Sequence, residues 1–281
     1  MSKPAQEEKP PGYTAKMRPE PRDDMRGYEG RGLLEDRRAL ITGGDSGIGR
    51  AVAVAFAKEG ADVAIAYLEE HSDAERTAEL VDAEQRRCAR LPGDLGSAEH
   101  CAAVVDQTVQ TLGGLDLLVN NVATQQPVER PEEITDEQWL RTFEVNMHSY
   151  FRVTTAALAH LGAGDAIINT SSVNGLRGHK GLIDYSATKG AINAWTYSMA
   201  QALAPRGIRV NCVAPGPVWT PLIPSTLSED HVEGFGENVP LGRPAEPDEL
   251  APSYVFLASN QLSSFYTGEI LSALGGETVP G

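Results

Sequence analysis

Tyr185 and Lys189 form a Y-x-x-x-K motif, Tyr185-Ser186-Ala187-Thr188-Lys189, that occurs once in the chain. The surrounding residues favour a helix, so the two side chains lie one turn apart on the same face. A tyrosine hydroxyl has a pKa of about 10 and is a poor base at neutral pH, but a nearby ammonium group stabilises the phenolate and lowers that pKa. The pair could therefore exchange a proton with a bound molecule, although two solvated neighbours would give the same pattern.

Ser172 lies 13 residues before Tyr185, directly after an apolar run that predicts a strand. Ligands collect at the carboxyl ends of parallel strands, which is where this serine is expected to lie. Serine is common before loops, so this residue is not diagnostic alone.

A glycine-rich turn follows the first apolar run, with the sequence Thr42-Gly43-Gly44-Asp45-Ser46-Gly47-Ile48-Gly49. Such a turn between a strand and a helix lets backbone N–H groups approach a pyrophosphate, and the positive end of the helix dipole adds attraction. The same glycine spacing could serve only a tight turn. Its place after the first strand and at the start of the first helix favours dinucleotide binding.

Strand-like and helix-like segments alternate along the rest of the chain. Apolar runs predict strands at 39–42, 62–67, 90–94, 115–120, 165–170, 208–213 and 270–274. Helical spacing predicts helices at 49–59, 71–87, 98–112, 136–160, 183–203 and 246–259. Strands that alternate with helices form parallel β-α-β units, and strands that are apolar throughout are typical of sheets covered on both faces. The pattern predicts an α/β fold.

Composition excludes several classes of protein. The chain has 281 residues, a net charge of −15 and a pI near 4.8, so its surface repels nucleic acids and anionic lipids. Its longest apolar run, 51–57, is far shorter than the roughly 18 residues of a membrane span. The first residues lack the apolar core of a secretion signal, and Cys88, Cys101 and Cys212 show neither disulfide nor zinc spacing. We expect a cytoplasmic protein without a bound metal, a nucleic-acid partner or a membrane partner.

Residues 1–36 predict an irregular arm in front of a catalytic domain at 37–281. Five prolines lie among charged residues in the arm, and apolar residues are sparse. The arm could be a floppy tail. It could also extend across a neighbouring subunit, anchored by Tyr13, Met17, Met25 and Tyr28.

Taken together, the motifs resemble the short-chain dehydrogenase/reductase family over roughly residues 37 to 275. Besides the glycine turn, Ser172 and the Y-x-x-x-K motif, the matching positions are Asp94, Asn120, Asn121, Asn146, Pro215, Gly216 and Thr220. The chain looks most like bacterial members with a proline-rich N-terminal extension, described as general-stress or glucose-dehydrogenase-like oxidoreductases. It departs from the family at Val122 and Ala123, which replace a smaller Ala-Gly pair beside the cofactor.

This resemblance implies a Rossmann-type three-layer α/β/α sandwich with a seven-stranded parallel sheet in the order 3-2-1-4-5-6-7. It implies an NAD(P)-dependent oxidoreductase that interconverts an alcohol and an aldehyde or ketone by hydride transfer. Tyr185 would be the acid or base, Lys189 would lower its pKa and hold the nicotinamide ribose, Ser172 would bind the substrate oxygen, and Asn146 would hold a water that links Lys189 to solvent. The implied cofactor contacts, besides Tyr185 and Lys189, are Gly43, Asp45, Ser46, Gly47, Ile48, Gly49, Tyr67, Leu68, Asp94, Leu95, Asn121, Val122, Pro215, Gly216, Val218 and Thr220. A polar stretch at 221–237 would be a flexible lid over the substrate.

The residues after the second predicted strand favour NAD over NADP. An acidic residue there would bind the 2′-hydroxyl of NAD, whereas an arginine would accommodate the 2′-phosphate of NADP. Leu68 offers neither group, but Glu69, Glu70 and Asp45 would repel a phosphate. Arg50, the one basic residue nearby, is expected to point along the first helix.

Two further hypotheses concern activity and assembly. The chain could be a dinucleotide-binding regulatory protein without catalysis, but the complete set of Ser172, Tyr185, Lys189 and Asn146 favours an enzyme. The helices at 136–160 and 183–203 carry apolar and small residues on more than one face, which indicates a second packing partner. Similar family members are commonly tetramers. The second packing face and this resemblance together predict a homotetramer.

Overall fold

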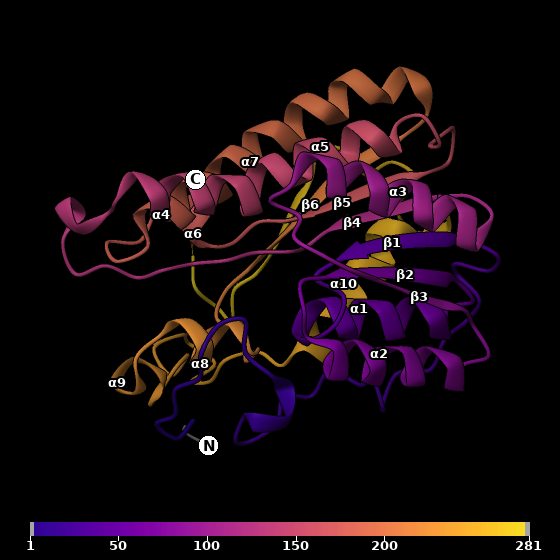
Figure 1. Cartoon of the computed structure of the whole chain (residues 1–281). Helices are drawn as coiled ribbons and strands as arrows, with labels where there is room; N and C mark the ends of the chain where they lie inside the picture. Colours follow the sequence, from indigo (N-terminus) through magenta and orange to yellow (C-terminus); the bar gives the residue numbers. More distant parts are fainter. Residues whose placement is uncertain (1–2, 279–281) are drawn as a thin grey trace.

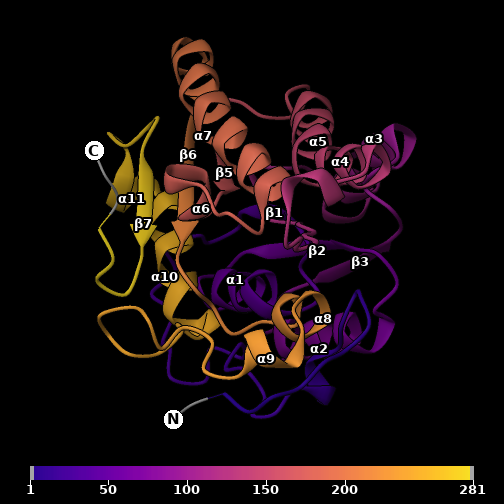
Figure 2. The same ribbon diagram turned by 90° about the vertical axis from the view of Figure 1, so that its left-hand side faces the viewer.

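Within residues 3–278, which the computed structural model describes, seven parallel strands form one sheet in the order β3-β2-β1-β4-β5-β6-β7 (Figures 1 and 2). The strands are β1 (Arg38–Thr42), β2 (Asp62–Tyr67), β3 (Cys88–Pro92), β4 (Leu117–Asn120), β5 (Ala166–Thr170), β6 (Arg209–Pro215) and β7 (Ile270–Ala273). The predicted strand order and the Rossmann-type sheet are confirmed. Residues 1–2 of the predicted arm and 279–281 of the predicted domain lie outside the described residues.

Helices cover both faces of this sheet (Figure 1). Their bounds are α1 (Gly47–Lys58), α2 (His71–Ala83), α3 (Ala98–Leu112), α4 (Asp136–Phe143), α5 (Ser149–Ala157), α6 (Asn174–Arg177), α7 (Ile183–Leu203), α8 (Leu222–Thr226), α9 (Glu229–Val232), α10 (Pro247–Ala258) and α11 (Asn260–Ser263). In one layer α1 packs against α2 and α10, and in the other α3 packs against α5. No helix among residues 3–278 is both long enough and apolar enough to cross a bilayer.

Adjacent residues of each strand enter opposite halves of the core. In β1, Ile41 packs with Phe56 of α1, while Leu40 packs with Val104 of α3 and Val153 of α5. All five residues are fully buried. Because both faces of the sheet are covered by helices, its strands are apolar throughout rather than alternately apolar and polar.

The helix predicted at 136–160 is helical without a break from Asp136 to Ala157, but it is not one regular α-helix. Five residues, Glu144–His148, form a π-helical segment between α4 and α5, and α5 ends at Ala157. Apolar spacing cannot reveal such a segment, because one widened turn changes the helical period only locally. Widened turns of this kind often occur at functional sites, and this one contains the fully buried Asn146.

The N-terminal arm packs against its own chain, so the expectation of a floppy tail is wrong. Met17 is fully buried in an apolar cluster with Trp219 and residues of α8 and α9, the helices of the predicted lid. The Trp219 indole donates a hydrogen bond to the Pro19 carbonyl at 2.8 Å, and the Lys3 ammonium lies 4.8 Å from the indole centroid. The second predicted anchor, Met25, is buried in the main core. These anchors therefore contact the same chain rather than a neighbouring subunit.

A buried arginine ties the arm to the rest of the fold. Arg50 of α1 is 3% exposed, and its guanidinium lies 3.1 Å from the Asp23 carboxylate of the arm and 2.9 Å from the Asp73 carboxylate of α2. The same guanidinium donates hydrogen bonds to the Asp45 carbonyl in the glycine turn at 2.8 and 3.0 Å. Asp73 also accepts a hydrogen bond from the Thr14 backbone N–H of the arm. One cation thus joins the arm, the glycine turn and α2.

We predict that Asp23→Ala lowers the free energy of unfolding by about 3 kcal/mol, the low end for breaking a buried ion pair, because Asp73 still faces Arg50. Thermal and denaturant unfolding measure the change. The matched control is Asp24→Ala, since Asp24 pairs locally with the exposed Arg26, and it should change stability by less than about 0.5 kcal/mol. Equal stability of the Asp23 variant and the wild type would contradict this role of the arm.

Candidate active site

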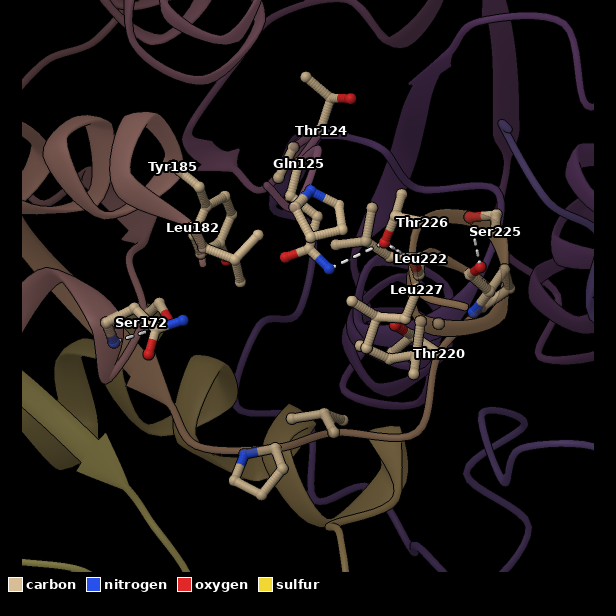
Figure 3. A pocket seen from close by; sticks show the side chains of 18 of the residues that line it. Thr124, Gln125, Ser172, Leu182, Tyr185, Thr220, Leu222, Ser225, Thr226 and Leu227 are labelled. Atoms are coloured by element: carbon tan, nitrogen blue, oxygen red, sulfur yellow. Dashed lines mark hydrogen bonds between the residues drawn. The ribbon is translucent and has the colours of Figure 1, made fainter. Parts of the chain in front are cut away.

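A cavity of about 1310 Å³ opens at the carboxyl edge of the sheet, between the strand ends and α8 (Figure 3). Its wall includes the glycine turn, Ser172, Tyr185 and Lys189. The catalytic and cofactor residues implied by the resemblance line the same cavity, except Gly49 and Asn146. The matching positions Thr42 and Asn120 are buried beside it. The fold therefore gathers positions more than 170 residues apart, from Gly43 to Thr220, into one site.

The glycine turn is shaped by the absence of side chains. A Cβ atom on Gly49 would lie 1.8 Å from the Gly43 carbonyl oxygen, and one on Gly47 would lie 3.0 Å from Thr220. Gly43 and Gly47 also adopt φ angles of +64° and +51°, which favour glycine. The Asn121 amide donates hydrogen bonds to the Thr42 and Gly43 carbonyls and holds the turn against β4. The backbone at the start of α1 is thus open to a pyrophosphate, so these residues fit a dinucleotide.

Tyr185, Lys189 and Ser172 lie at the deep end of the cavity. Lys189 is 1% exposed, and its ammonium donates a hydrogen bond to the Thr170 carbonyl at 2.7 Å and lies 5.5 Å from the Tyr185 ring centroid. The Ser172 hydroxyl oxygen accepts a hydrogen bond from the Asn174 N–H at 3.1 Å. That bond does not use its own proton, which can point toward Tyr185 or a ligand from the same side of the cavity as Tyr185 (Figure 3).

Burial has the largest effect on the pKa values of Tyr185 and Lys189. It raises the pKa of the Tyr185 hydroxyl to about 12, against a smaller lowering by Ser172. Burial also lowers the pKa of Lys189 to about 7. The Lys189 ammonium donates its hydrogen bond to the Thr170 carbonyl, and its role in lowering the Tyr185 pKa stays a prediction. Tyr185 carries its proton at neutral pH, as a proton donor requires.

Asn146 braces the wall of the cavity from the π-helical segment. The side-chain carbonyl oxygen of Asn146 accepts a hydrogen bond from the Thr124 N–H at 2.8 Å. Its amide group donates one hydrogen bond to the Thr124 carbonyl at 2.8 Å and another to the Thr188 hydroxyl at 3.2 Å. Both amide protons are used within the protein. The Asn146 side chain thus joins the loop after β4 to α7, and its role in holding a water beside Lys189 stays a prediction.

The end of the cavity next to β2 is acidic. Asp45 and Glu70 are buried, Glu69 is exposed, and Leu68 is 41% exposed. Burial, with a further contribution from the Glu70 charge, raises the pKa of Asp45 to about 7. Arg50 cannot offset this acidity at the ligand, because its guanidinium is enclosed by Asp23 and Asp73.

Asp94 lies at the rim of the cavity with its carboxylate already paired. The Arg141 guanidinium of α4 donates two hydrogen bonds to this carboxylate, at 2.8 and 3.1 Å. The Gly96 N–H donates a third at 2.8 Å. These bonds, working against partial burial, hold the pKa of Asp94 below its usual value. Contact with an adenine through this carboxylate would therefore compete with Arg141.

Gln125, Pro10 and Pro11 also line the cavity and were not expected from the sequence. Gln125 forms a hydrogen bond with Thr226 of the predicted lid. These residues belong to no recognisable motif. They meet through contacts between segments more than 100 residues apart, which no local periodicity records.

Comparisons with known proteins agree with this geometry. A family model described as enoyl-(acyl carrier protein) reductase matches residues 43–278. The chain is 53% identical to General stress protein 39 of Bacillus subtilis, with 96% of this chain and 94% of that protein covered. It is 46% identical to NADPH-dependent aldehyde reductase 1, chloroplastic, of Arabidopsis thaliana, covering 96% of each. It is 45% identical to glucose and ribitol dehydrogenase of Daucus carota, covering 99% and 97%. The crystal structure of a short chain dehydrogenase from Burkholderia cenocepacia in complex with NADP is similar with a TM-score of 0.81 at 31% identity, covering 87% of this chain and 98% of that one.

Proposed function

The chain belongs to the short-chain dehydrogenase/reductase family of oxidoreductases, and from this premise we propose that it interconverts an alcohol and an aldehyde or ketone. The observation that carries the proposal is the placement of Tyr185, Ser172 and the glycine turn around one cavity. A proton donor, a second hydroxyl and a pyrophosphate cradle are the groups that carbonyl reduction with a dinucleotide requires.

A nicotinamide dinucleotide bound along the glycine turn would supply the hydride for the substrate carbon, or accept it in the reverse direction. In reduction, the Tyr185 hydroxyl gives its proton to the carbonyl oxygen while Ser172 donates a hydrogen bond to that oxygen and stabilises its developing charge. With a pKa raised by burial to about 12, Tyr185 carries the proton at neutral pH that this step needs. Lys189, one turn away, would hold the ribose hydroxyls.

Tyr185→Phe is expected to lower turnover by at least roughly a hundredfold and to leave dinucleotide affinity nearly unchanged, because it removes only the proton that is transferred. Absorbance of the reduced nicotinamide follows turnover, and calorimetry measures affinity. Tyr197→Phe is the matched control, since Tyr197 is 46% exposed and lies outside the cavity. Turnover by the Tyr185 variant at the wild-type rate would refute its role as acid. Dinucleotide binding with no turnover of any alcohol or carbonyl compound by the wild type would instead favour a non-catalytic regulatory protein.

NAD is the proposed preferred cofactor, although the relatives described above include an NADPH-dependent enzyme and a complex with NADP. Support comes from the charges beside the end of β2, where the ribose 2′ position lies in this class of fold. Asp45, Glu69 and Glu70 would repel a 2′-phosphate, and the guanidinium of Arg50 is enclosed by carboxylates. Leu68 offers no donor to a phosphate.

The preference for NAD should depend on pH through Asp45. Its pKa of about 7 means that the carboxyl is ionised and repulsive above pH 7 but neutral below it. Wild-type protein should bind NAD at least about tenfold more tightly than NADP near pH 8, with a smaller ratio near pH 6. Asp45→Asn should lower the ratio of NAD affinity to NADP affinity near pH 8. It should also make this ratio change less between pH 6 and pH 8 than it does in the wild type, in which the 2′-phosphate titrates in the same way. Tenfold tighter binding of NADP near pH 8 would reverse the assignment.

A homotetramer is the proposed assembly. The exposed large apolar side chains include Leu140 (59%) and Phe151 (53%) on α4 and α5, and Leu262 (48%) and Phe265 (98%) before β7. Contiguous exposed apolar residues are typical of interaction surfaces. Two separate surfaces allow two-fold contacts about different axes, as a tetramer with dihedral symmetry requires.

Light scattering should give a mass of about 120 kDa, four copies of a 30.1 kDa chain. Phe265→Asp should reduce this mass, because it places a charge on an apolar contact. A wild-type mass near the 30.1 kDa of the single chain at micromolar concentration would contradict the tetramer.

A further inference from the structure

The amide of Gln125 has one orientation, and its neighbours determine it. The Gln125 Nε2 donates a hydrogen bond to the Thr226 hydroxyl oxygen at 2.8 Å, while that hydroxyl donates to the Leu222 carbonyl at 2.5 Å. A hydroxyl has a single proton, so Thr226 can only accept from Gln125. The NH₂ group of Gln125 must therefore face α8, and its carbonyl oxygen faces the opposite side of the cavity, where Leu182 and Tyr185 lie (Figure 3).

The backbone on both sides of Gln125 is held in place. Asn146 bonds both the N–H and the carbonyl of Thr124, and the Gln138 amide donates to the Gln126 carbonyl at 3.0 Å. Gln125 itself is 8% exposed. A side chain supported in this way is preorganised, so it can discriminate among ligands without first being ordered.

The carbonyl oxygen of Gln125 has no hydrogen-bond donor among the described residues. The side chains drawn near it, Leu182, Leu222 and Leu227, are apolar and cannot donate (Figure 3). The hydroxyls of Tyr185 and Ser172 are committed to the reacting oxygen in the proposed function. An oriented acceptor without a protein partner selects a ligand that brings a donor, and it disfavours a carboxylate or phosphate at the same place.

We propose that Gln125 is a specificity-determining residue that accepts a hydrogen bond from a second hydroxyl of the substrate, next to the reacting carbon. The substrate class is then a hydroxylated aldehyde or ketone, with the corresponding diol or polyol in the opposite direction. This inference rests on the proposed function, because Tyr185 and Ser172 define where the reacting oxygen lies. A site built to pair with a substrate hydroxyl rejects the analogue that lacks it, because the bound analogue would cover this acceptor without pairing it.

The experiment compares kcat/KM for two pairs of compounds that differ in hydroxylation: ethylene glycol against ethanol, and glyceraldehyde against propionaldehyde. Gln125→Met keeps the length of the side chain and removes both the acceptor and the amide. The preference for the hydroxylated member should fall by about tenfold in this variant, with kcat/KM for the other member nearly unchanged. Comparing the ratio between wild type and variant cancels the intrinsic difference in reactivity within each pair.

Two controls separate recognition from structure. Gln126→Met makes the same chemical change at the exposed neighbour, outside the cavity, and should leave both ratios at the wild-type value. Gln125→Glu retains an acceptor and should retain the preference, which a purely structural role in holding α8 would not predict. Unchanged ratios in Gln125→Met, with all compounds turned over, would overturn the role of Gln125 and leave the proposed function intact. Turnover of these compounds by Tyr185→Phe at the wild-type rate would count against the proposed function itself.

Discussion

The close approach of α1 to the end of β1 is the constraint on which the rest of the structure depends. Gly49 packs directly on the Gly43 carbonyl, and no residue with a Cβ fits there. This contact brings the positive end of α1 to the cavity and places the next residue, Arg50, beneath the turn. Arg50 then draws together Asp23 and Asp73. Through Arg50 the arm is joined to the glycine turn, and through Met17 the arm also packs against α8. The arm therefore connects the glycine turn to α8.

The reacting end of the cavity is held by a second group of buried polar contacts. The Thr170 carbonyl, at the end of β5, accepts a hydrogen bond from the Lys189 ammonium. Asn146 joins the loop after β4 to α7. Both contacts occur where strands end, because a parallel sheet brings its carboxyl ends to one edge. Burial raises the pKa of Tyr185 to about 12 and lowers the pKa of Lys189 to about 7. Tyr185 is therefore protonated at neutral pH.

The architecture could be predicted from the sequence because its signals are local. Apolar strands, helical spacing and the glycine turn specify β-α-β units, and the sheet order followed from family resemblance. The π-helical segment at Asn146 escaped prediction because it alters only one turn. The docking of Met17 and Asp23, the inward turn of Arg50 and the contact between Gln125 and Thr226 escaped because they join residues distant in the chain. The high pKa of Tyr185 depends on burial, which motif spacing does not encode.

A crystal structure of the chain with a bound nicotinamide dinucleotide would test whether one ligand joins the two ends of the cavity. The pyrophosphate should lie against the backbone of Gly47 and Ile48, the adenosine ribose beside Leu68, and the nicotinamide ring beside Tyr185 and Ser172. The hydride-bearing carbon should then face the space between the Tyr185 hydroxyl and the Gln125 carbonyl oxygen. A dinucleotide bound elsewhere, or one whose nicotinamide ring lies away from Tyr185, would contradict the proposed chemistry.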